Sequence, residues 1–386
     1  MGCQESTPKH MQDFTIKICK GSVIGAYVGD AAGGVLEFMR SITRNQVLNA
    51  LTFPGGGAMR LGQGQITDDS EMAQCILYGI LEQQRISKTK NLVLDLDNIT
   101  KYYGTWMRCA FDIGNTTRNA LKVIDPENPS PLDVFHNVAT NSTSHSTSNG
   151  CLMRITPQAV WGHNLSNQDL KIAVELQTNL THSVPKVVDA CYIYCLAIKH
   201  LIHYPGDARG AYNFAKQEST KILSWFENIE IENLPNPQKN IGQSEIAFSY
   251  AFYYLRKVIT QQDLSFEKIM EDTLFLGGDT DTNAAIVGGL LGAYFGVKRI
   301  PTNWINSILN FDKTKNDRSQ IGQQNSGIAR PQFLIPKHNL INDLDILVKN
   351  APTKLSVKYM GRIYTNQDSI KNILNEARNQ RIAQIV

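Results

Sequence analysis

Apolar residues recur at helical spacing along most of this chain. The run from Ala284 to Val297 contains no charged residue, and it is shorter than the roughly 20 residues that span a bilayer, so it predicts a buried helix. Apolar residues between Met72 and Leu81 lie one turn apart and predict an amphipathic helix. Further helical segments are predicted near residues 95–110, 168–180, 185–203, 208–227, 243–258 and 265–275. Few stretches alternate as strands do, so the chain is expected to be mostly helical.

Two of the apolar segments carry glycines spaced four residues apart. They are Gly21, Gly25, Gly29 and Gly33 in the first segment, and Gly288, Gly292 and Gly296 in the second. A glycine inside a helix costs about 1 kcal/mol relative to alanine, so each ridge needs a compensating contact. Close approach of another helix backbone would provide it. We expect each ridge to pack against a small-residue surface, and the two ridges are candidates to face each other.

An acidic cluster directly precedes the second apolar segment. The sequence from Gly277 to Asn283 contains Asp279, Asp281 and two threonines just before a predicted helix. One interpretation is that these oxygens only cap the helix, which needs a single Asp or Thr. The other is that Asp279 and Asp281 point at a common centre and bind a hard cation such as Mg²⁺, Ca²⁺ or Mn²⁺.

A second cluster, from Gln65 to Glu71, again places a threonine and paired aspartates before a helix. Asp68 and Glu71 stand three apart, as in a capping box, so part of this acidity has a structural explanation. Adjacent carboxylates, however, raise one another's pKa unless a cation lies between them. Two such clusters, one near each end of the chain, favour two helix N-termini that converge on a shared metal site.

Composition restricts the partners and the compartment. The 386 residues are 42% hydrophobic and 19% charged, and the formal net charge of +3 gives no electrostatic case for nucleic-acid binding. The 7 cysteines are scattered without a C-x-x-C motif, and the polar N-terminus lacks the apolar stretch of a secretory signal. We therefore expect a reduced, cytoplasmic protein, and a monomer. The expected organisation is a flexible segment 1–14, a domain 15–350 and a C-terminal appendage 351–386.

The first residues fit the pattern for N-terminal acylation. Gly2 follows Met1 and Ser6 stands at the required position for myristoylation. Cys3 would accept a second acyl chain, and stable membrane anchoring needs two chains. The alternative is a chance match, because the pattern is short.

Glu37 stands in an apolar setting, between Val35-Leu36 and Phe38-Met39. A carboxylate in this company is either an acid or base with a raised pKa, or a surface residue at a helix end.

Five motifs in this order resemble those of the ADP-ribosylglycohydrolase family, which includes the dinitrogenase reductase-activating glycohydrolase and ADP-ribosylarginine hydrolases. The motifs are Gly29-Asp30-Ala31-Ala32-Gly33, Glu37-Phe38, Thr67-Asp68-Asp69-Ser70, Asn149-Gly150 with Met153-Arg154, and Gly278-Asp279-Thr280-Asp281-Thr282-Asn283-Ala284. The resemblance covers roughly residues 18–311. It implies an all-α fold, a compact single-domain bundle of many helices, with a dinuclear Mg²⁺ site at converging helix N-termini. It also implies removal of ADP-ribose from modified protein side chains, with ADP-ribose as the product.

The resemblance also implies roles for individual residues. The metal ligands would be Thr67, Asp68, Asp69, Asp279, Asp281 and Thr282, holding two Mg²⁺ ions or, alternatively, Mn²⁺. Glu37 corresponds to the family's mobile glutamate near the scissile bond, and Glu37 or Asp69 would act as general base. Asp112 lies in a stretch, 111–116, that resembles the substrate loop of arginine-directed members. The backbone of Ser148, Asn149 and Gly150 would cradle the diphosphate, and His182 would lie near the substrate unless it serves only the core or a helix end.

Three classes of function remain open. The first is a hydrolase acting on N-linked ADP-ribose, with arginine favoured, or on O-linked serine adducts or free ADP-ribose derivatives. The second is a prenyl-type diphosphate lyase or transferase, whose D-D-x-x-D spacing is absent here because Ser70 and Glu71 follow the aspartate pair. The third is a non-catalytic ADP-ribose binder, which would tolerate loss of Glu37 or of the acidic ligands. All of these are present, which favours the hydrolase.

Overall fold

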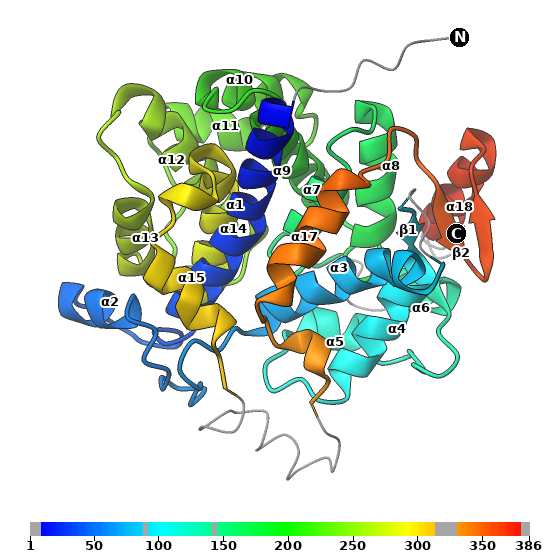
Figure 1. Cartoon of the computed structure of the whole chain (residues 1–386), viewed down its shortest axis with the longest axis horizontal. Helices are drawn as coiled ribbons and strands as arrows, with labels where there is room; N and C mark the ends of the chain where they lie inside the picture. Colours follow the sequence, from blue (N-terminus) through cyan, green and yellow to red (C-terminus); the bar gives the residue numbers. More distant parts are fainter. Residues whose placement is uncertain (1–8, 88–91, 141–144, 313–329, 380–386) are drawn as a thin grey trace.

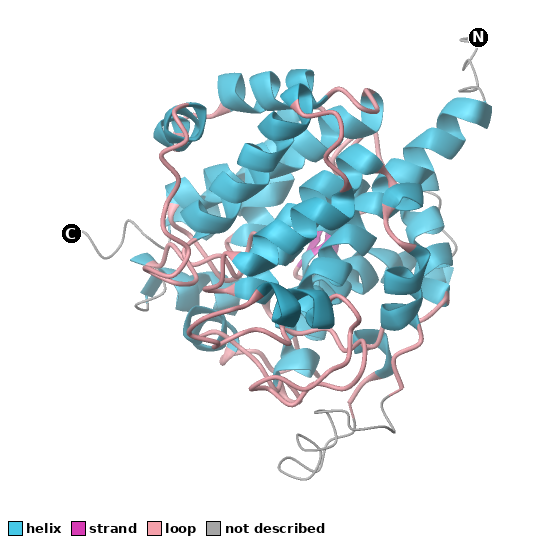
Figure 2. Ribbon diagram, turned by 90° about the vertical axis from the view of Figure 1, so that its left-hand side faces the viewer, coloured by secondary structure: helices cyan, strands magenta, loops and turns pink. Residues whose placement is uncertain are grey.

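The computed structural model describes residues 9–87, 92–140, 145–312 and 330–379, and within them the fold is mostly helical (Figures 1 and 2). The α-helices are α1 Lys9–Gly33, α2 Arg44–Ala50, α3 Asp68–Ser87, α4 Leu96–Met107, α5 Asn115–Leu121, α6 Pro131–Thr140, α7 Thr156–Trp161, α8 Asn167–Thr178, α9 Pro185–His203, α10 Ala208–Glu218, α11 Leu223–Glu230, α12 Ser244–Thr260, α13 Phe266–Phe275, α14 Thr280–Phe295, α15 Thr302–Leu309, α17 Asn339–Lys349 and α18 Gln367–Asn379. Short 3₁₀ helices are η2 Val297–Arg299 and η3 Gln332–Leu334. The all-α prediction is confirmed.

The glycine ridges bring α1 and α14 together in the centre of the molecule (Figure 1). A Cβ added to Gly25 would overlap the carbonyl oxygen of Gly288, and a Cβ on Gly292 would overlap that of Gly21. The two backbones therefore run antiparallel in direct contact, which confirms that the ridges face each other. Further along, the hydroxyl of Thr280 donates to the carbonyl of Gly33 over 2.8 Å. This contact fixes the acidic start of α14 beside the end of α1.

One predicted helix is interrupted. The segment 208–227 forms two helices, α10 and α11, because the backbone of Ser219 is extended. The buried carboxylate of Asp189 accepts hydrogen bonds from the backbone N–H groups of Thr220 (3.0 Å) and Lys221 (2.7 Å). These bonds satisfy donors that a continuous helix would have paired with its own carbonyls.

A small sheet joins the C-terminal residues to the helical body. Strand β1 (Leu94–Asp95) pairs in parallel with β2 (Val357–Tyr359), which pairs antiparallel with β3 (Arg362–Tyr364). The N–H groups of the turn residues Met360 and Gly361 donate to Asp97 at 2.7 and 2.8 Å. Helix α18 buries Ile370, Ile373 and Leu374 in the common core. The segment 351–379 thus packs on the body, while the domain boundary at residue 350 stays a prediction.

The first eight residues, with the predicted acylation sites Gly2 and Cys3, lie outside the described residues. Within the described ranges, no helix combines the length and the hydrophobicity needed to cross a membrane.

Candidate metal centre and active site

The start of α3 is held by a buried carboxylate from α1. Asp30 is fully buried and accepts hydrogen bonds from the backbone N–H of Thr67 (2.9 Å), the hydroxyl of Thr67 (2.7 Å) and the N–H of Ser70 (3.0 Å). Asp30 therefore caps the N-terminus of α3 from a different helix. As a result, the carboxylates of Asp68 and Asp69 are not needed as caps.

The capping interpretation also fails at the other acidic positions. Glu71 does not form a capping box with Asp68, because its carboxylate pairs with Arg330 and accepts a 2.7 Å hydrogen bond from the indole N–H of Trp106. Asp279 occupies the N-cap position of α14 without a side-chain capping bond. Its Oδ2 instead accepts from the amide of Asn149 over 2.7 Å. Both acidic clusters thus exceed what helix capping requires.

The two clusters meet in space. The hydroxyl oxygen of Thr67 lies 3.2 Å from a carboxylate oxygen of Asp69 and 3.4 Å from one of Asp281, which links the start of α3 to the start of α14. Carboxylate oxygens of Glu37, Asp112 and Asp281 lie within 4.8 Å of one another. The convergence of the two helix N-termini, predicted from the sequence, is therefore present in the structure.

This carboxylate cluster, which comprises Glu37, Asp68, Asp69, Asp112, Asp279 and Asp281, is electrostatically strained. Burial raises the pKa of Asp68, Asp69 and Asp281 well above the usual range, and the charges of their neighbours raise it further. The pKa of Glu37 rises to about 8, first through burial and then through Asp112 and Asp279. No lysine, arginine or histidine in the described residues forms an ion pair with a member of the cluster.

The donor set fits a hard divalent cation. Among the described side chains, Asp69 Oδ1 and Glu37 Oε2 are buried oxygens without a hydrogen-bond partner. Leaving such atoms unpaired is costly, and an isolated buried charge more so. A cation placed between the carboxylates would satisfy these oxygens and remove their mutual repulsion. Oxygen-only ligands are those that Mg²⁺ and Mn²⁺ prefer.

The predicted diphosphate loop is braced from several sides. The N–H of Asn149 donates to the carbonyl of Gly242 over 2.8 Å, and the hydroxyl of Ser244 donates to the carbonyl of Ser148 over 2.8 Å. The buried guanidinium of Arg154 donates to the carbonyl of Gly150 over 2.9 Å. Because the Asn149 N–H is already used within the protein, a diphosphate here would need other donors of the loop.

His182 lies beneath this loop and is fully buried. Its Nε2 is 2.7 Å from the hydroxyl of Ser148, and its Nδ1 is 2.8 Å from the hydroxyl of Thr181. A Cβ added to Gly150 would press on the imidazole ring, with Cε1 at 3.3 Å. His182 is thus a core residue that also supports the loop, and its predicted place near the substrate stays a prediction.

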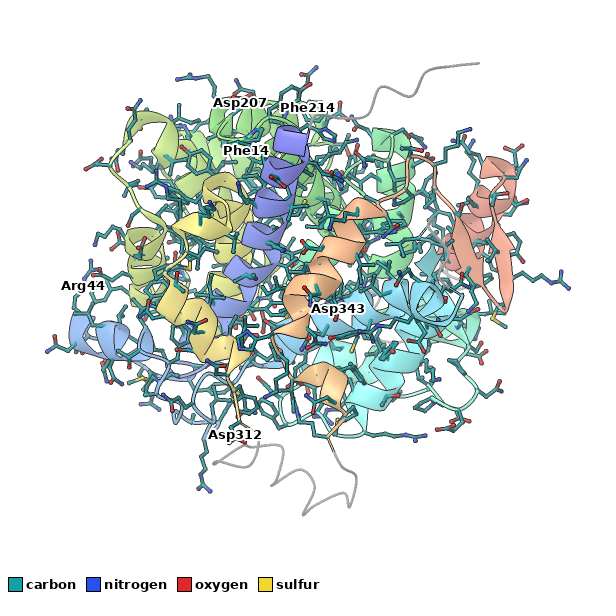
Figure 3. All side chains as sticks on the ribbon, viewed as in Figure 1. Phe14, Arg44, Asp207, Phe214, Asp312 and Asp343 are labelled. Carbon is teal, nitrogen blue, oxygen red and sulfur yellow. The ribbon has the colours of Figure 1, made fainter. Side chains whose placement is uncertain are left out.

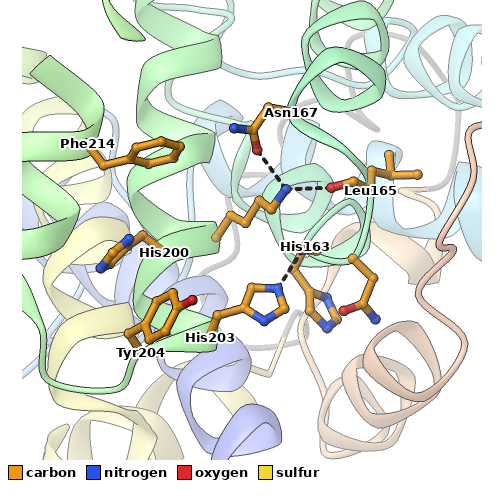
Figure 4. A pocket seen from close by; sticks show the side chains of 9 residues that line it. His163, Leu165, Asn167, His200, His203, Tyr204 and Phe214 are labelled. Carbon is orange, nitrogen blue, oxygen red and sulfur yellow. Dashed lines mark hydrogen bonds between the residues drawn. The ribbon is translucent and has the colours of Figure 1, made fainter. Parts of the chain in front are cut away.

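A separate cavity lies at the C-terminal end of α9 (Figure 4). It has a volume of about 610 Å³ and is lined by His163, Asn164, Leu165, Asn167, Lys199, His200, His203, Tyr204 and Phe214. Figure 3 labels Asp207 and Phe214 on the same side of the molecule as Phe14, which belongs to the first turns of α1. The carboxylate cluster lies towards the other end of α9, because His182, just before α9, contacts Ser148, and the neighbouring Asn149 donates to Asp279 of the cluster.

The sequence model of a family described as ADP-ribosylglycohydrolase matches residues 11–330. The chain belongs to the ADP-ribosylglycohydrolase family. The members named below are hydrolases, in keeping with the prediction of an enzyme.

Individual relatives agree with this assignment. The ADP-ribosyl-(dinitrogen reductase) glycohydrolase of Rhodospirillum rubrum is 29% identical over 299 residues, covering 75% of this chain and 89% of that protein. The ADP-ribosylarginine hydrolase Tri1 of Serratia proteamaculans is 26% identical over 310 residues, covering 78% of each. A solved structure named as an ADP-ribosylglycohydrolase-related protein complex shares the fold, with a TM-score of 0.63 and 20% identity over 88% of this chain and 100% of that one.

Two residues that matter for the site escaped the sequence analysis. Asp30 appears in the sequence analysis only as part of the motif from Gly29 to Gly33, with no role of its own, although it is a lone carboxylate within an apolar segment. Arg330 lies beyond the stretch of recognised motifs, so no spacing connected it with Glu71.

Proposed function

We propose that this protein is a Mg²⁺-dependent hydrolase that removes ADP-ribose from modified protein side chains by cleaving the N-glycosidic bond, with arginine as the favoured linkage. The observation that supports it best is the cluster of buried and half-buried carboxylates from three helix ends and the connection before α5, none of which forms an ion pair with a described basic side chain. Family membership supports the ADP-ribose-directed reaction.

The cation ligands would be the residues at the starts of α3 and α14, namely Thr67, Asp68, Asp69, Asp279, Asp281 and Thr282. When bound, two Mg²⁺ ions would supply positive charge that neutralises these carboxylates and orients the ribose hydroxyls. Asp30 would keep Thr67 in place by accepting hydrogen bonds from its N–H and its hydroxyl, with a further bond from the N–H of Ser70.

Glu37 is the favoured general base, and Asp69 is the alternative. Glu37 follows the end of α1, and Oε2 of its half-buried side chain has no hydrogen-bond partner. Burial and the neighbouring carboxylates raise the pKa of Glu37, and cations bound in the cluster would lower it again towards neutrality, where a carboxylate is suited to take a proton from an attacking water. Positive charge developing on the ribose during bond cleavage would be stabilised by the surrounding carboxylates.

Asp112 supports the arginine linkage. Its carboxylate lies in the cluster beside Glu37 and Asp281, where the scissile bond would be placed. A carboxylate can accept two N–H donors from a guanidinium leaving group, which a serine hydroxyl cannot offer. The name of the Serratia relative, an arginine-directed hydrolase, points the same way. Ser148, Gly150 and His182 would support the diphosphate.

The direct test is to incubate the purified protein with arginine-linked, serine-linked and DNA-linked ADP-ribose, each with Mg²⁺ and with a chelator. We expect release of ADP-ribose from the arginine adduct, dependent on Mg²⁺. A faster reaction on the serine adduct would show that serine, not arginine, is the favoured linkage, and the protein would still be an ADP-ribose hydrolase. Binding of ADP-ribose without turnover on any substrate would identify a non-catalytic binder.

We also propose that the protein is a cytoplasmic monomer that is anchored to membranes by myristoyl and palmitoyl groups on Gly2 and Cys3. The sequence pattern at the N-terminus supports this proposal. One acyl chain gives only marginal membrane binding, and Cys3, next to Gly2, offers a site for a second chain. Fractionation of cells expressing the native protein and Gly2→Ala tests this: the native protein should sediment with membranes and the variant should not. A native protein found only in the soluble fraction would end the proposal.

A further inference from the structure

A buried arginine from the C-terminal third of the chain fastens the loop that carries Asp112. Arg330 is 4% exposed and forms an ion pair with Glu71, which is 1% exposed. One of its terminal nitrogens donates to the carbonyl of Cys109 over 3.4 Å, and its guanidinium carbon lies 5.1 Å from the centre of the Phe111 ring. The single side chain therefore contacts α3 and two residues of the connection between α4 and α5.

Both partners of Arg330 lead directly to the carboxylate cluster. Glu71 lies less than one turn after Asp68 and Asp69 on α3. Cys109 and Phe111 belong to the connection 108–114, in which Asp112 follows Phe111. The indole of Trp106, at the end of α4, donates to the same Glu71 carboxylate over 2.7 Å. Arg330, Glu71 and Trp106 thus tie the Asp112 loop to the helix that provides the predicted metal ligands.

Arg330 is itself held in place by its neighbours. Phe333, in the following 3₁₀ helix η3, packs edge-on against Tyr102 of α4 with ring centres 4.6 Å apart, and against Tyr78 of α3 at 6.1 Å. These contacts anchor the backbone next to Arg330 on the same two helices. The guanidinium therefore reaches the Asp112 loop from a fixed position.

We propose that Arg330 is a positioning residue that sets the preference of the enzyme for guanidinium-linked ADP-ribose by fixing the Asp112 loop against α3. The proposal rests on the proposed function, because it takes arginine adducts as the substrates that Asp112 recognises. A bidentate contact between a carboxylate and a guanidinium needs both groups in a narrow range of orientations. Holding Asp112 in one orientation thus favours that leaving group over a serine oxygen, which makes a single, less directional contact.

The contacts require an arginine. Its planar guanidinium can donate to Glu71 and to the Cys109 carbonyl at once while lying over the Phe111 ring. A lysine at this position keeps the charge that Glu71 needs but has one nitrogen, which cannot make all three contacts. Arg330→Lys is therefore a test that avoids leaving Glu71 as an unpaired buried charge.

The experiment compares Arg330→Lys with the native protein on arginine-linked and serine-linked ADP-ribose. We expect the ratio of kcat/KM for arginine over serine to fall by about tenfold, mostly through KM for the arginine substrate. In the Asp112→Ala background, Arg330→Lys should change the ratio no further, because the group it positions is gone. An unchanged ratio in the native background, or an equal fall in both backgrounds, would overturn the proposal.

Hydrogen exchange separates the positioning role from the proposed function. Amides of residues 109–114 should exchange faster in Arg330→Lys, whether or not the protein hydrolyses arginine adducts. Arg378→Lys is the matched control, because Arg378 also pairs with a carboxylate, Glu175, but on the far C-terminal helix. It should change neither the ratio nor exchange in the loop. If Arg330→Lys fails to fold, Glu71→Gln takes its place and should also lower the kcat/KM ratio and speed exchange in residues 109–114. Unchanged exchange of these residues in a folded variant would contradict the proposal.

Discussion

In the cavity at the end of α9, polar side chains find partners within the protein. Lys199 donates to the carbonyl of Leu165 and, over 2.9 Å, to the side-chain oxygen of Asn167. His203 donates to the carbonyl of His163 over 2.8 Å, and burial lowers the pKa of His163 to about 4, which keeps it neutral. In the carboxylate cluster, burial and repulsion raise several pKa values, and the described residues offer no cation to relieve them.

On this basis we assign the reactive site to the carboxylate cluster, because its charges lack partners, rather than to the α9 cavity, which is a large hollow with paired polar groups. The α9 cavity needs no ligand to satisfy its polar groups, since its ammonium and imidazole groups already have hydrogen-bond partners within the protein. The cluster, in contrast, stores unfavourable electrostatic energy that a divalent cation would remove. Functional sites often retain such strain, because the groups that would relieve it are the ligands.

The largest effect is expected from removing a charge within the cluster. Asp281→Asn or Asp68→Asn should abolish turnover, because each removes a charged ligand. In chelator, the same variants should melt at a higher temperature than the native protein, since a repulsive buried charge is gone. Thermal melts with and without Mg²⁺, alongside activity assays, measure both effects.

Asp343→Asn is the matched control for those variants. Asp343 is also buried, but it is paired with Arg85 and accepts a 3.2 Å hydrogen bond from Tyr78. Its substitution should destabilise the protein by about 1–3 kcal/mol and leave activity intact. If Asp281→Asn behaved like Asp343→Asn, the carboxylate cluster would have a structural role, as the paired carboxylate of Asp343 does.

The next effect concerns Glu37. Glu37→Gln preserves shape and removes the base, so kcat should fall by about 10²–10⁴-fold. Binding of ADP-ribose, measured by calorimetry, should persist, because the other cluster carboxylates and the loop at Ser148 are unchanged. Loss of binding together with rate would make Glu37 a structural residue.

A smaller, substrate-dependent effect is expected at Asp112. Asp112→Ala should reduce kcat/KM on arginine-linked ADP-ribose by about 10–100-fold, the value of charge-assisted hydrogen bonds. The loss on a substrate with a neutral leaving group should be clearly smaller. Equal losses on both substrates would instead assign Asp112 to the metal site, which its position beside Asp281 also permits.

The smallest effect is expected in the α9 cavity. Lys199→Met removes two hydrogen bonds and should cost about 1–2 kcal/mol of stability. Its kcat/KM should equal that of the native protein, as determined in the same assays. A large loss of activity in this variant would show that the α9 cavity also takes part in the reaction, which contradicts its assignment to the carboxylate cluster alone.

Much of this arrangement could be predicted from the sequence, because its signals are local. The glycine spacing in α1 and α14 predicted their contact, and acidic residues before apolar runs predicted the two helix starts that converge. The β1–β2–β3 sheet was not predicted, because its strands have two or three residues and no alternation can show in so few. The Asp30 and Arg330 contacts could not be predicted, because each joins residues far apart in the chain through one side chain.

Calorimetric titration of Mg²⁺ into chelator-treated protein measures directly, without any substrate, whether the carboxylate cluster binds cations. We expect saturable binding of about two ions, reduced in Asp281→Asn and unchanged in Asp343→Asn, with hydrolysis restored over the same Mg²⁺ range. Full hydrolysis in chelator, or no saturable binding by the native protein, would contradict it.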